Sequence, residues 1–455
     1  MSVLRNATIA ALAIGMLGTT AAIDAPAVAE DITVKLWTRA DRSGPLRGGN
    51  IVRAADTLNK QFAAAGLDAK ITVEVHENNA KGFDADALDL MKAFAADKGP
   101  DLYVAAHEWI GAFTEAGYAM NLEEHIAANP EYYGDIIEVL WESVKFKGAR
   151  YGVPQDSEVR MFFYNKNMMR QAGMSEELIE GLPAAVESGE FTIYDLVDLA
   201  KQVKDSGAAK YGMVHRPNVG PDFQMTMASF GIEPYDAKQA KLQISESKLA
   251  NFYTWLKYAV DQGVLPENMT AWSWDSTHAA FRGGESFLKF HGIWNVGQQM
   301  KAFGLNNEEE YFNAIGWIHS PVEKKGGRPA NLSHPIIYVV NPASPRAELA
   351  AYLVALASQP IPNTEHALGT FHTPINYSQT AIPEFVEKGW ALRAGTPMLE
   401  YSGFMPNHTK IGQYNAVIYK GIQGVETGRL SPEEGAAFVV EELEAELDDD
   451  VIILE

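Results

Sequence analysis

The 455-residue sequence contains no cysteine, so it can form neither a disulfide nor a thiolate metal site. It also has no N-terminal cysteine that could carry a lipid anchor. No apolar run reaches the roughly 18 uninterrupted residues that a transmembrane helix needs. Basic residues are scarce: 37 Lys and Arg stand against 59 Asp and Glu, a formal net charge of −22. This charge argues against nucleic acid, anionic membrane surfaces and polyanionic ligands as partners.

The first 29 residues have the composition of a secretory signal. Arg5 precedes an alanine-rich apolar run at residues 7–22, and small residues follow at 27–29. This run is too short to span a membrane. We therefore expect a signal peptide at residues 1–29, a mature chain from Glu30, and a soluble protein in a bacterial periplasm without a lipid anchor.

Motifs for catalysis and cofactor binding are also missing. A glycine-rich loop has Asn50 at the position where a phosphate-binding loop needs lysine. No HExxH motif occurs, and His107 and His125 lack metal-ligand spacing. Asp156 and Glu158 are candidates for a glycosidase pair, but two carboxylates on one short segment are weak evidence. We expect no enzyme activity, no cofactor and no metal, with a secreted glycosidase as the less favoured alternative.

Hydrophobic residues make up 47% of the chain, and a chain of this length favours two lobes over one core. Strand patterns occur at residues 32–37, 71–76 and 101–106, with helical spacing between them. Alternating strands and helices indicate a parallel sheet with helical crossovers. Ligands of such sheets bind at the carboxyl ends of the strands, so residues just after each strand are candidate contacts.

Polar or aromatic side chains follow all three of these strands: Asp41 and Arg42 after the first, Glu77 and Asn78 after the second, and His107, Glu108 and Trp109 after the third. Each of them alone is compatible with an ordinary solvated loop. Their coincidence at three successive strand ends predicts a ligand-binding edge of the sheet.

The segment at residues 147–166 predicts the passage into a second lobe. The Gly-Val-Pro unit at residues 152–154 forces an extended path, and the apolar run at 159–164 is typical of a buried strand. A polar stretch that ends in Glu158 lies between them, and Arg160 stands inside the apolar run. A polar cluster between two lobes is suited to holding a soluble ligand.

Aromatic side chains beside charged ones in loops suit a hydroxylated ligand. An aromatic face covers the C–H surface of a sugar ring, while Asp, Glu and Arg bond to adjacent hydroxyls. Trp274 lies in a polar loop, and Trp294 ends a predicted turn and strand at residues 281–294. Any one tryptophan is more often a core residue than a ligand contact, so aromatics alone do not establish the function.

Six segments in order resemble the bacterial extracellular solute-binding family 1, the periplasmic receptors of sugar ABC importers, and are similar to its maltose-binding members. They are a first strand that ends in Trp37 and the stretches at residues 99–122, 151–166, 279–294, 341–350 and 405–407. The resemblance implies a two-lobed α/β fold of the periplasmic binding protein type II. Each lobe is then a mixed, mainly parallel sheet flanked by helices, and a hinge joins the lobes.

The resemblance also implies lobes that are discontinuous in sequence. The expected N-terminal lobe takes residues 30–155 and about 323–378, and the expected C-terminal lobe takes residues 156–322 and about 379–455. A ligand that touches both lobes favours the closed form and so drives closure. Closure would then present the receptor to the membrane permease subunits of an ABC importer.

The resemblance implies sugar contacts by position: Asp41, Arg42, Glu108, Glu158, Trp294 and Tyr414. Trp109, Arg160 and Trp274 complete the predicted site. Trp109 stands where maltose-binding members have arginine, and Arg160 has no matching charge. We therefore expect a monomeric receptor for a mono- or oligosaccharide, with an acidic sugar, an amino acid or a polyamine as alternatives, and no nucleic-acid partner.

Overall fold

The structure is a computed structural model, which describes residues 30–40, 44–80 and 82–455. Three predicted features lie outside these ranges: the signal peptide at residues 1–29, Asp41 and Arg42. Within the described ranges, no helix is long and apolar enough to cross a membrane.

The chain forms two compact units, each of which is discontinuous in sequence. Unit 1 contains the described residues up to Ser157 together with Pro335–Gly389. Unit 2 contains Glu158–His334 together with Trp390–Glu455. The chain therefore passes from one unit to the other three times.

Unit 1 is built on a five-stranded sheet with the order β2-β1-β3-β14-β6. Its strands are β1 (Glu30–Arg39), β2 (Ala69–Asn78), β3 (Leu102–Ala106), β14 (Ile336–Val340) and β6 (Val153–Pro154). β1 runs parallel to β2 and β3, whereas β14 runs antiparallel to β3 and β6. β1 follows the alternation in its sequence, since Val34 and Leu36 are buried and Lys35 between them is exposed.

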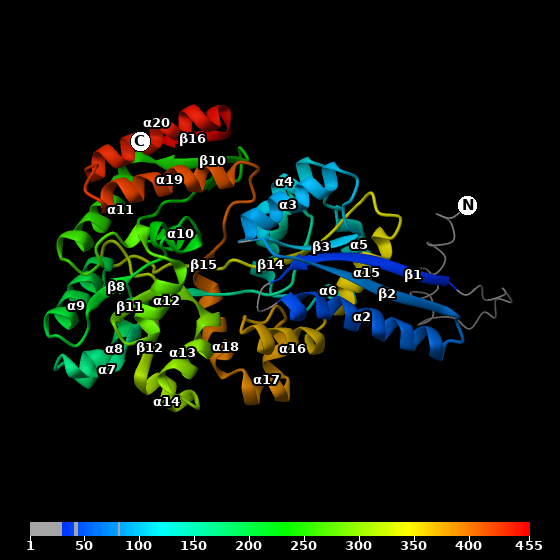
Figure 1. Ribbon diagram of the computed structural model, residues 1–455, viewed down its shortest axis with the longest axis horizontal. Helices are drawn as coiled ribbons and strands as arrows, with labels where there is room; N and C mark the ends of the chain where they lie inside the picture. The colour runs from blue at the N-terminus through cyan, green and yellow to red at the C-terminus, as the bar shows by residue number, and fades with distance from the viewer. Residues whose placement is uncertain (1–29, 41–43, 81) are drawn as a thin grey trace. The chain divides into compact units, whose positions relative to one another are not determined.

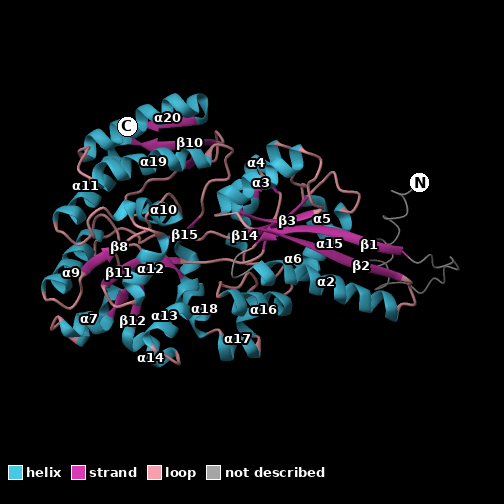
Figure 2. Cartoon of the chain, viewed as in Figure 1, coloured by secondary structure: helices cyan, strands magenta, loops and turns pink. Residues whose placement is uncertain are grey.

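Helices flank the unit 1 sheet (Figures 1 and 2). α2 (Gly44–Ala64) connects β1 to β2, and α3 (Phe83–Ala95) connects β2 to β3. α2 packs against β2 and against α15 (Ala347–Ala357) and α16 (Pro360–Thr370). Because β1, β2 and β3 are parallel, their carboxyl ends lie at one edge of the sheet.

Unit 2 contains a four-stranded sheet with the order β12-β7-β11-β8. Its strands are β7 (Arg160–Asn165), β8 (Tyr211–Val214), β11 (Ser286–Gly292) and β12 (Ile315–Ile318). β11 runs parallel to β8, and β7 runs antiparallel to both β11 and β12. Every residue of β7 is buried, which agrees with the continuous apolar run that Arg160 begins.

A second sheet of unit 2 includes the C-terminal tail. β16 (Val451–Leu454) pairs in parallel with β10 (Lys241–Ser245), which pairs with β9 (Tyr235–Asp236). α11 (Glu246–Asp261), α19 (Ile411–Glu426) and α20 (Pro432–Leu447) pack together beside this sheet (Figure 1). The apolar end of the chain is therefore an edge strand.

The boundaries of the two units differ from the expected lobes. Residues after 322 remain in unit 2 because β13 (Asn331–Leu332) pairs with β15 (Ser402–Gly403). Residues after 378 remain in unit 1 because α17 (Pro383–Lys388) packs against η5 (Tyr377–Ala381) and α16. Short pairings of this kind have no periodicity that a sequence pattern could reveal.

Candidate functional site

The first candidate site lies at the carboxyl ends of β1, β2 and β3. We call it the unit 1 cluster: Trp37, Arg39, Asn78, Asp84, Asp86, Glu108 and Trp109. Trp37 Nε1 donates to Asp86 Oδ1 at 3.1 Å, and Asn78 Nδ2 donates to the same oxygen at 2.8 Å. Burial raises the pKa of Asp86, although these two hydrogen bonds oppose the shift. The Arg39 guanidinium lies 4.3 Å from the Phe83 ring centre.

The predicted residues Glu108 and Trp109 belong to this cluster. Both lie in η1 (His107–Trp109), the short helix that directly follows β3. Trp109 Nε1 donates to the exposed Asp84 at 3.0 Å, and Glu108 is buried. The structure therefore places both residues at the strand end, as the sequence predicted.

The polar stretch at the crossing is divided between the two units. Asp156, in unit 1, is fully buried and lies 2.7 Å from Arg47 Nη1. It also accepts from the backbone N–H of Ile336 at 3.0 Å, and His366 Nε2 lies 3.2 Å away. Burial opposes ionisation of Asp156, but Arg47 and the two histidines His372 and His366 hold its pKa well below the usual range. Asp156 therefore anchors the chain inside unit 1, and Glu158 begins unit 2.

The second candidate site lies in unit 2. We call it the unit 2 cluster: Glu158, Arg160, Arg216, Asp222, Trp274, His278, Lys289, His291 and Trp294. At its centre, Arg160 bonds to Asp222, and its Nη2 lies 2.6 Å from Glu158 Oε1. The same guanidinium lies 4.8 Å from the Trp294 ring centre, a cation–π contact. One arginine thus joins two carboxylates and an aromatic ring.

A second arginine repeats this arrangement beside the first. Arg216 Nη1 lies 3.5 Å from Asp222 Oδ2, and its guanidinium lies 5.2 Å from the Trp274 ring centre. The His291 ring contacts both tryptophans edge to face, with centroid distances of 5.0 Å to Trp274 and 4.9 Å to Trp294. Both tryptophans are half-buried. The two tryptophan rings therefore contact the same buried histidine.

The most deeply buried side chains of the unit 2 cluster include several basic groups. Lys289 Nζ lies 2.7 Å from His278 Nδ1. Burial lowers the pKa of Lys289 to about 7, with Asp222 opposing the shift and Arg282 adding to it. Burial opposes the charge on Arg160 as well, but Glu158 and Asp222 raise the pKa of that guanidinium.

Two glycines make room for the cluster. A Cβ on Gly292, which ends β11, would lie 1.5 Å from the Trp294 ring, so only glycine lets this ring fold back against the strand. Gly220 has a φ of +153°, and a Cβ there would lie 2.0 Å from Arg216 Cζ. The positions of the Trp294 and Arg216 side chains therefore each require a glycine in the neighbouring backbone.

Tyr414 is not part of either cluster. Its side chain is fully buried in the hydrophobic core of unit 2, and its hydroxyl donates to the backbone oxygen of Gln243 at 2.8 Å. The expectation of a ligand contact rested on resemblance alone, and the apolar spacing of α19 points Tyr414 inward instead. We therefore remove Tyr414 from the candidate site.

Sequence reasoning missed several residues of the unit 2 cluster: Arg216, Asp222, His278, Lys289 and His291. A signal for two of them was present. Lys289 and His291 stand two residues apart in the apolar strand β11, so they share one face of it. Buried charged or polar residues in a strand are rare and require partners, which makes them candidates for a site.

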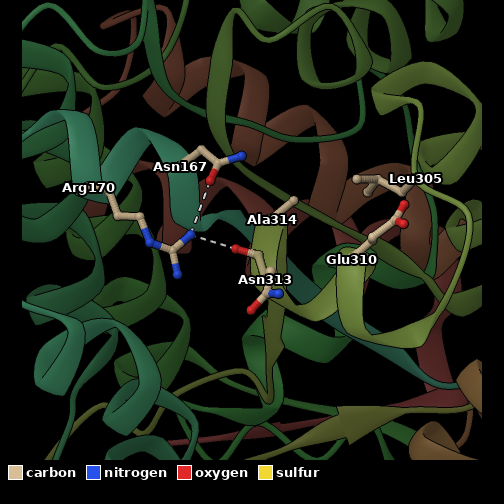
Figure 3. A pocket seen from close by; sticks show the side chains of 6 residues that line it. All are labelled: Asn167, Arg170, Leu305, Glu310, Asn313 and Ala314. Carbon is tan, nitrogen blue, oxygen red and sulfur yellow. Dashed lines mark hydrogen bonds between the residues drawn. The ribbon is translucent and has the colours of Figure 1, made fainter.

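A separate hollow of about 460 Å³ lies elsewhere in unit 2. Its lining comes from α7 (Lys166–Gln171), α14 (Glu308–Ala314) and the preceding turn: Asn167, Arg170, Leu305, Glu310, Asn313 and Ala314. Arg170 Nη1 donates to Asn167 Oδ1 at 3.0 Å and to the Asn313 backbone oxygen at 2.6 Å (Figure 3). None of the lining residues belongs to the unit 2 cluster.

Solved structures share the fold of this chain. The GacH receptor of Streptomyces glaucescens, solved with acarbose, has a TM-score of 0.70 at 17% identity, over 93% of this chain and 99% of that chain. An ABC transporter solute-binding protein of Thermotoga lettingae, solved with α-D-tagatose, has a TM-score of 0.69 at 20% identity, over 91% and 99%. At these identities the likeness shows the fold, and it confirms the predicted two-domain α/β class with mixed sheets and flanking helices.

The sequence also matches a protein family. Residues 48–360 match the family described as bacterial extracellular solute-binding protein, and the chain belongs to this family. A maltotriose-binding protein of Pyrococcus abyssi is 22% identical over 249 residues, which is 54% of this chain and 48% of the relative. The chain thus spans about half the length of the curated relatives it matches. The predicted resemblance is confirmed.

Proposed function

We propose that this chain is a receptor that binds a mono- or oligosaccharide and delivers it to the permease of an ABC importer. The observation that carries the proposal is the unit 2 cluster, in which Trp274 and Trp294 lie beside the ion-paired residues Arg160 and Asp222. Aromatic surfaces cover the C–H face of a sugar, and ionised side chains bond strongly to its hydroxyls. The relatives named for maltotriose, acarbose and tagatose support the same ligand class.

In unit 2 we propose that Glu158, Arg160, Trp274 and Trp294 contact the sugar. In unit 1 we propose that Glu108 and Trp109 are sugar contacts. Trp37 and Arg39, near the carboxyl end of β1, are proposed as contacts together with them. The predicted contacts Asp41 and Arg42 stay predictions, as do the hinged closure and the monomeric state. Export to the periplasm is part of the proposal, and membership of an extracellular family supports it.

We propose that the protein binds its ligand without chemical change. A glycosidase needs one carboxyl group that donates a proton and one that stays ionised. Asp156 is unsuited to the first role, because it is fully buried and its pKa is well below the usual range. Glu158 lies within 2.6 Å of Arg160, an ion pair that favours its ionised form. Asp156 and Glu158 therefore do not supply the protonated and ionised carboxyl pair that a glycosidase requires.

A polyamine fits the unit 2 cluster poorly. Three cations, Arg160, Arg216 and Lys289, stand against the two carboxylates Glu158 and Asp222. A cationic ligand would add to this excess and would have to lose its water without a compensating carboxylate. This favours a sugar over the polyamine alternative.

A thermal-shift screen tests the proposal. The panel contains neutral mono-, di- and trisaccharides, with amino acids, spermidine and acidic sugars beside them. A ligand at 100 times its dissociation constant adds about 2.7 kcal/mol to the free energy of unfolding, which is visible as a rise in Tm. We expect a shift with sugars. A shift with amino acids or spermidine and with no sugar would contradict the proposal.

A further inference from the structure

The unit 2 cluster concentrates positive charge in a strongly acidic protein. Arg160, Arg216 and Lys289 meet only two carboxylates within the cluster, although the whole chain carries a net charge of −22. Both carboxylates are engaged with arginine, and Asp222 is shared between two of them. The local charge balance is thus opposite in sign to that of the molecule.

His291 lies among these positively charged groups. Its side chain is 2% exposed, and within the described residues neither ring nitrogen has a hydrogen-bond partner. Burial lowers the pKa of His291 well below its usual value, and the cations Lys289, Arg160 and Arg216, with His278, lower it further. This happens although Asp222 Oδ2 lies only 3.7 Å from His291 Nδ1. The nearest carboxylate therefore does not offset the combined effect of burial and the surrounding positive groups on His291.

The surroundings of Lys289 also contain more basic than acidic groups. The groups that face it are His278 and Arg282 from α12 (Trp274–Arg282), Asp222 from α10 (Pro221–Ala228), and His291 on the same strand. Only Asp222 among them is acidic, and Asp222 already bonds to Arg160. A buried ammonium group with so little compensation is costly unless a ligand supplies the missing charge.

On this basis, and resting on the proposed sugar-binding function, we infer that the ligand is an acidic sugar that carries one negative charge, such as a hexuronate. The sugar ring would lie against Trp274 or Trp294. Its carboxylate would complete the charge balance of Arg216, Arg160 and Lys289, since oppositely charged partners strengthen hydrogen bonds in a buried setting. A polyanionic ligand is disfavoured, because the net charge of the whole protein repels it.

The test compares sugars that differ only at C6, where one member has CH₂OH and the other a carboxylate. The pairs are glucose and glucuronate, and galactose and galacturonate. Glucose 6-phosphate is added to distinguish a carboxylate from another anionic group. Dissociation constants are measured by isothermal titration calorimetry with the full chain. We expect the acidic member of at least one pair to bind about 10- to 100-fold more tightly than its neutral partner.

A matched pair of lysine variants locates the effect. Lys289→Met removes a buried cation of the cluster, and Lys166→Met removes another buried lysine of unit 2, which pairs with Glu180 at 2.6 Å outside the cluster. Lys289→Met should reduce the preference for the acidic sugar by about tenfold, while Lys166→Met leaves it unchanged. Both variants are checked for folding by circular dichroism and Tm, and Arg216→Gln replaces Lys289→Met if the latter does not fold.

The outcomes separate this inference from the proposed function. Neutral sugars that bind as tightly as their acidic partners, or more tightly, overturn the acidic-sugar inference and leave the sugar receptor intact. Preference for glucose 6-phosphate over every carboxylate also overturns it. Binding of amino acids or spermidine, without binding of any sugar in the pairs, contradicts both the acidic-sugar inference and the proposed sugar-receptor function.

Discussion

The guanidinium carbon of Arg160 lies 4.8 Å from the centre of the Trp294 ring, while its nitrogens reach the carboxylates of Glu158 and Asp222. Arg160 opens β7, and Trp294 follows β11, the antiparallel neighbour in which Gly292 pairs with Arg160. The register of these two strands therefore brings the Trp294 ring next to the ion pairs of Arg160.

Arg160→Gln should reduce the free energy of unfolding by about 3 to 5 kcal/mol, because it removes the buried cation that Glu158 and Asp222 share and leaves Asp222 only its longer contact with Arg216. Urea unfolding measures the change. Adding Asp222→Asn to this variant should restore part of the stability, since it removes one of the two buried carboxylates that have lost Arg160. Arg170→Gln is the control: its ion pair with Glu176 lies at the surface and should be worth less than about 1 kcal/mol. Equal stability of Arg160→Gln and the wild type would contradict the buried network.

Trp274→Ala should weaken sugar binding by about 1 to 3 kcal/mol, because it removes an aromatic surface from the unit 2 cluster. Trp272→Ala is the matched control. Trp272 is also half-buried, but its ring packs against Tyr211 at a centroid distance of 5.4 Å and lies outside the unit 2 cluster. Calorimetric titration of both variants with the same sugar measures the difference. If Trp272→Ala lost more affinity than Trp274→Ala, the ligand would not lie against Trp274.

Lys289→Met should stabilise the ligand-free protein at pH 7, by up to a few kcal/mol. The pKa of Lys289 is about 7 in the folded protein against an ordinary value of 10.5, so the unfolded chain binds more protons between these values. The cost of burying the charged lysine is therefore fully present below pH 7 and is relieved as the pH rises toward 10.5. Urea unfolding at pH 6, 8 and 10 should show a gain from the variant that shrinks with increasing pH. A gain that grows with pH would reverse the sign and contradict the assignment.

Asp156→Asn should cost about 3 to 5 kcal/mol at neutral pH, because Arg47 then remains buried without its carboxylate. The pKa of Asp156 in the folded protein is well below its ordinary value of 3.8. Its contribution is thus present above pH 4 and is lost as the pH falls further, so wild type and variant should converge in acid. Unfolding curves at pH 3, 5 and 7 measure this. A constant difference at all three values would show that the loss does not come from the charge.

The sequence was sufficient for the parts of the fold with strong periodicity. The alternation around Val34 and Leu36 predicts β1, and the apolar run after Arg160 predicts the buried strand β7. The antiparallel pairing of β7 with both neighbours was not predictable, because a fully buried strand has the same pattern in either direction. The unit boundaries were also missed, since they depend on the two-residue strands β13 and β15.

The candidate site was predictable only in part. Glu108 and Trp109 follow a strand whose direction the sequence indicates, and the structure places both at the end of β3. Arg216 and Asp222 come from a loop and the first turn of α10, and only tertiary structure brings Asp222 to Arg160. Tyr414 shows the opposite error, because an aromatic residue on an apolar helix face packs into the core unless another observation places it in a site.

The most direct test of the unit 2 cluster as a sugar site is a crystal structure of the protein with the sugar that gives the largest thermal shift. We predict electron density for a sugar ring against Trp274 or Trp294, with hydrogen bonds to Glu158 or Arg160. A sugar bound in the hollow beside Arg170, or anywhere without contact to the unit 2 cluster, would contradict the account.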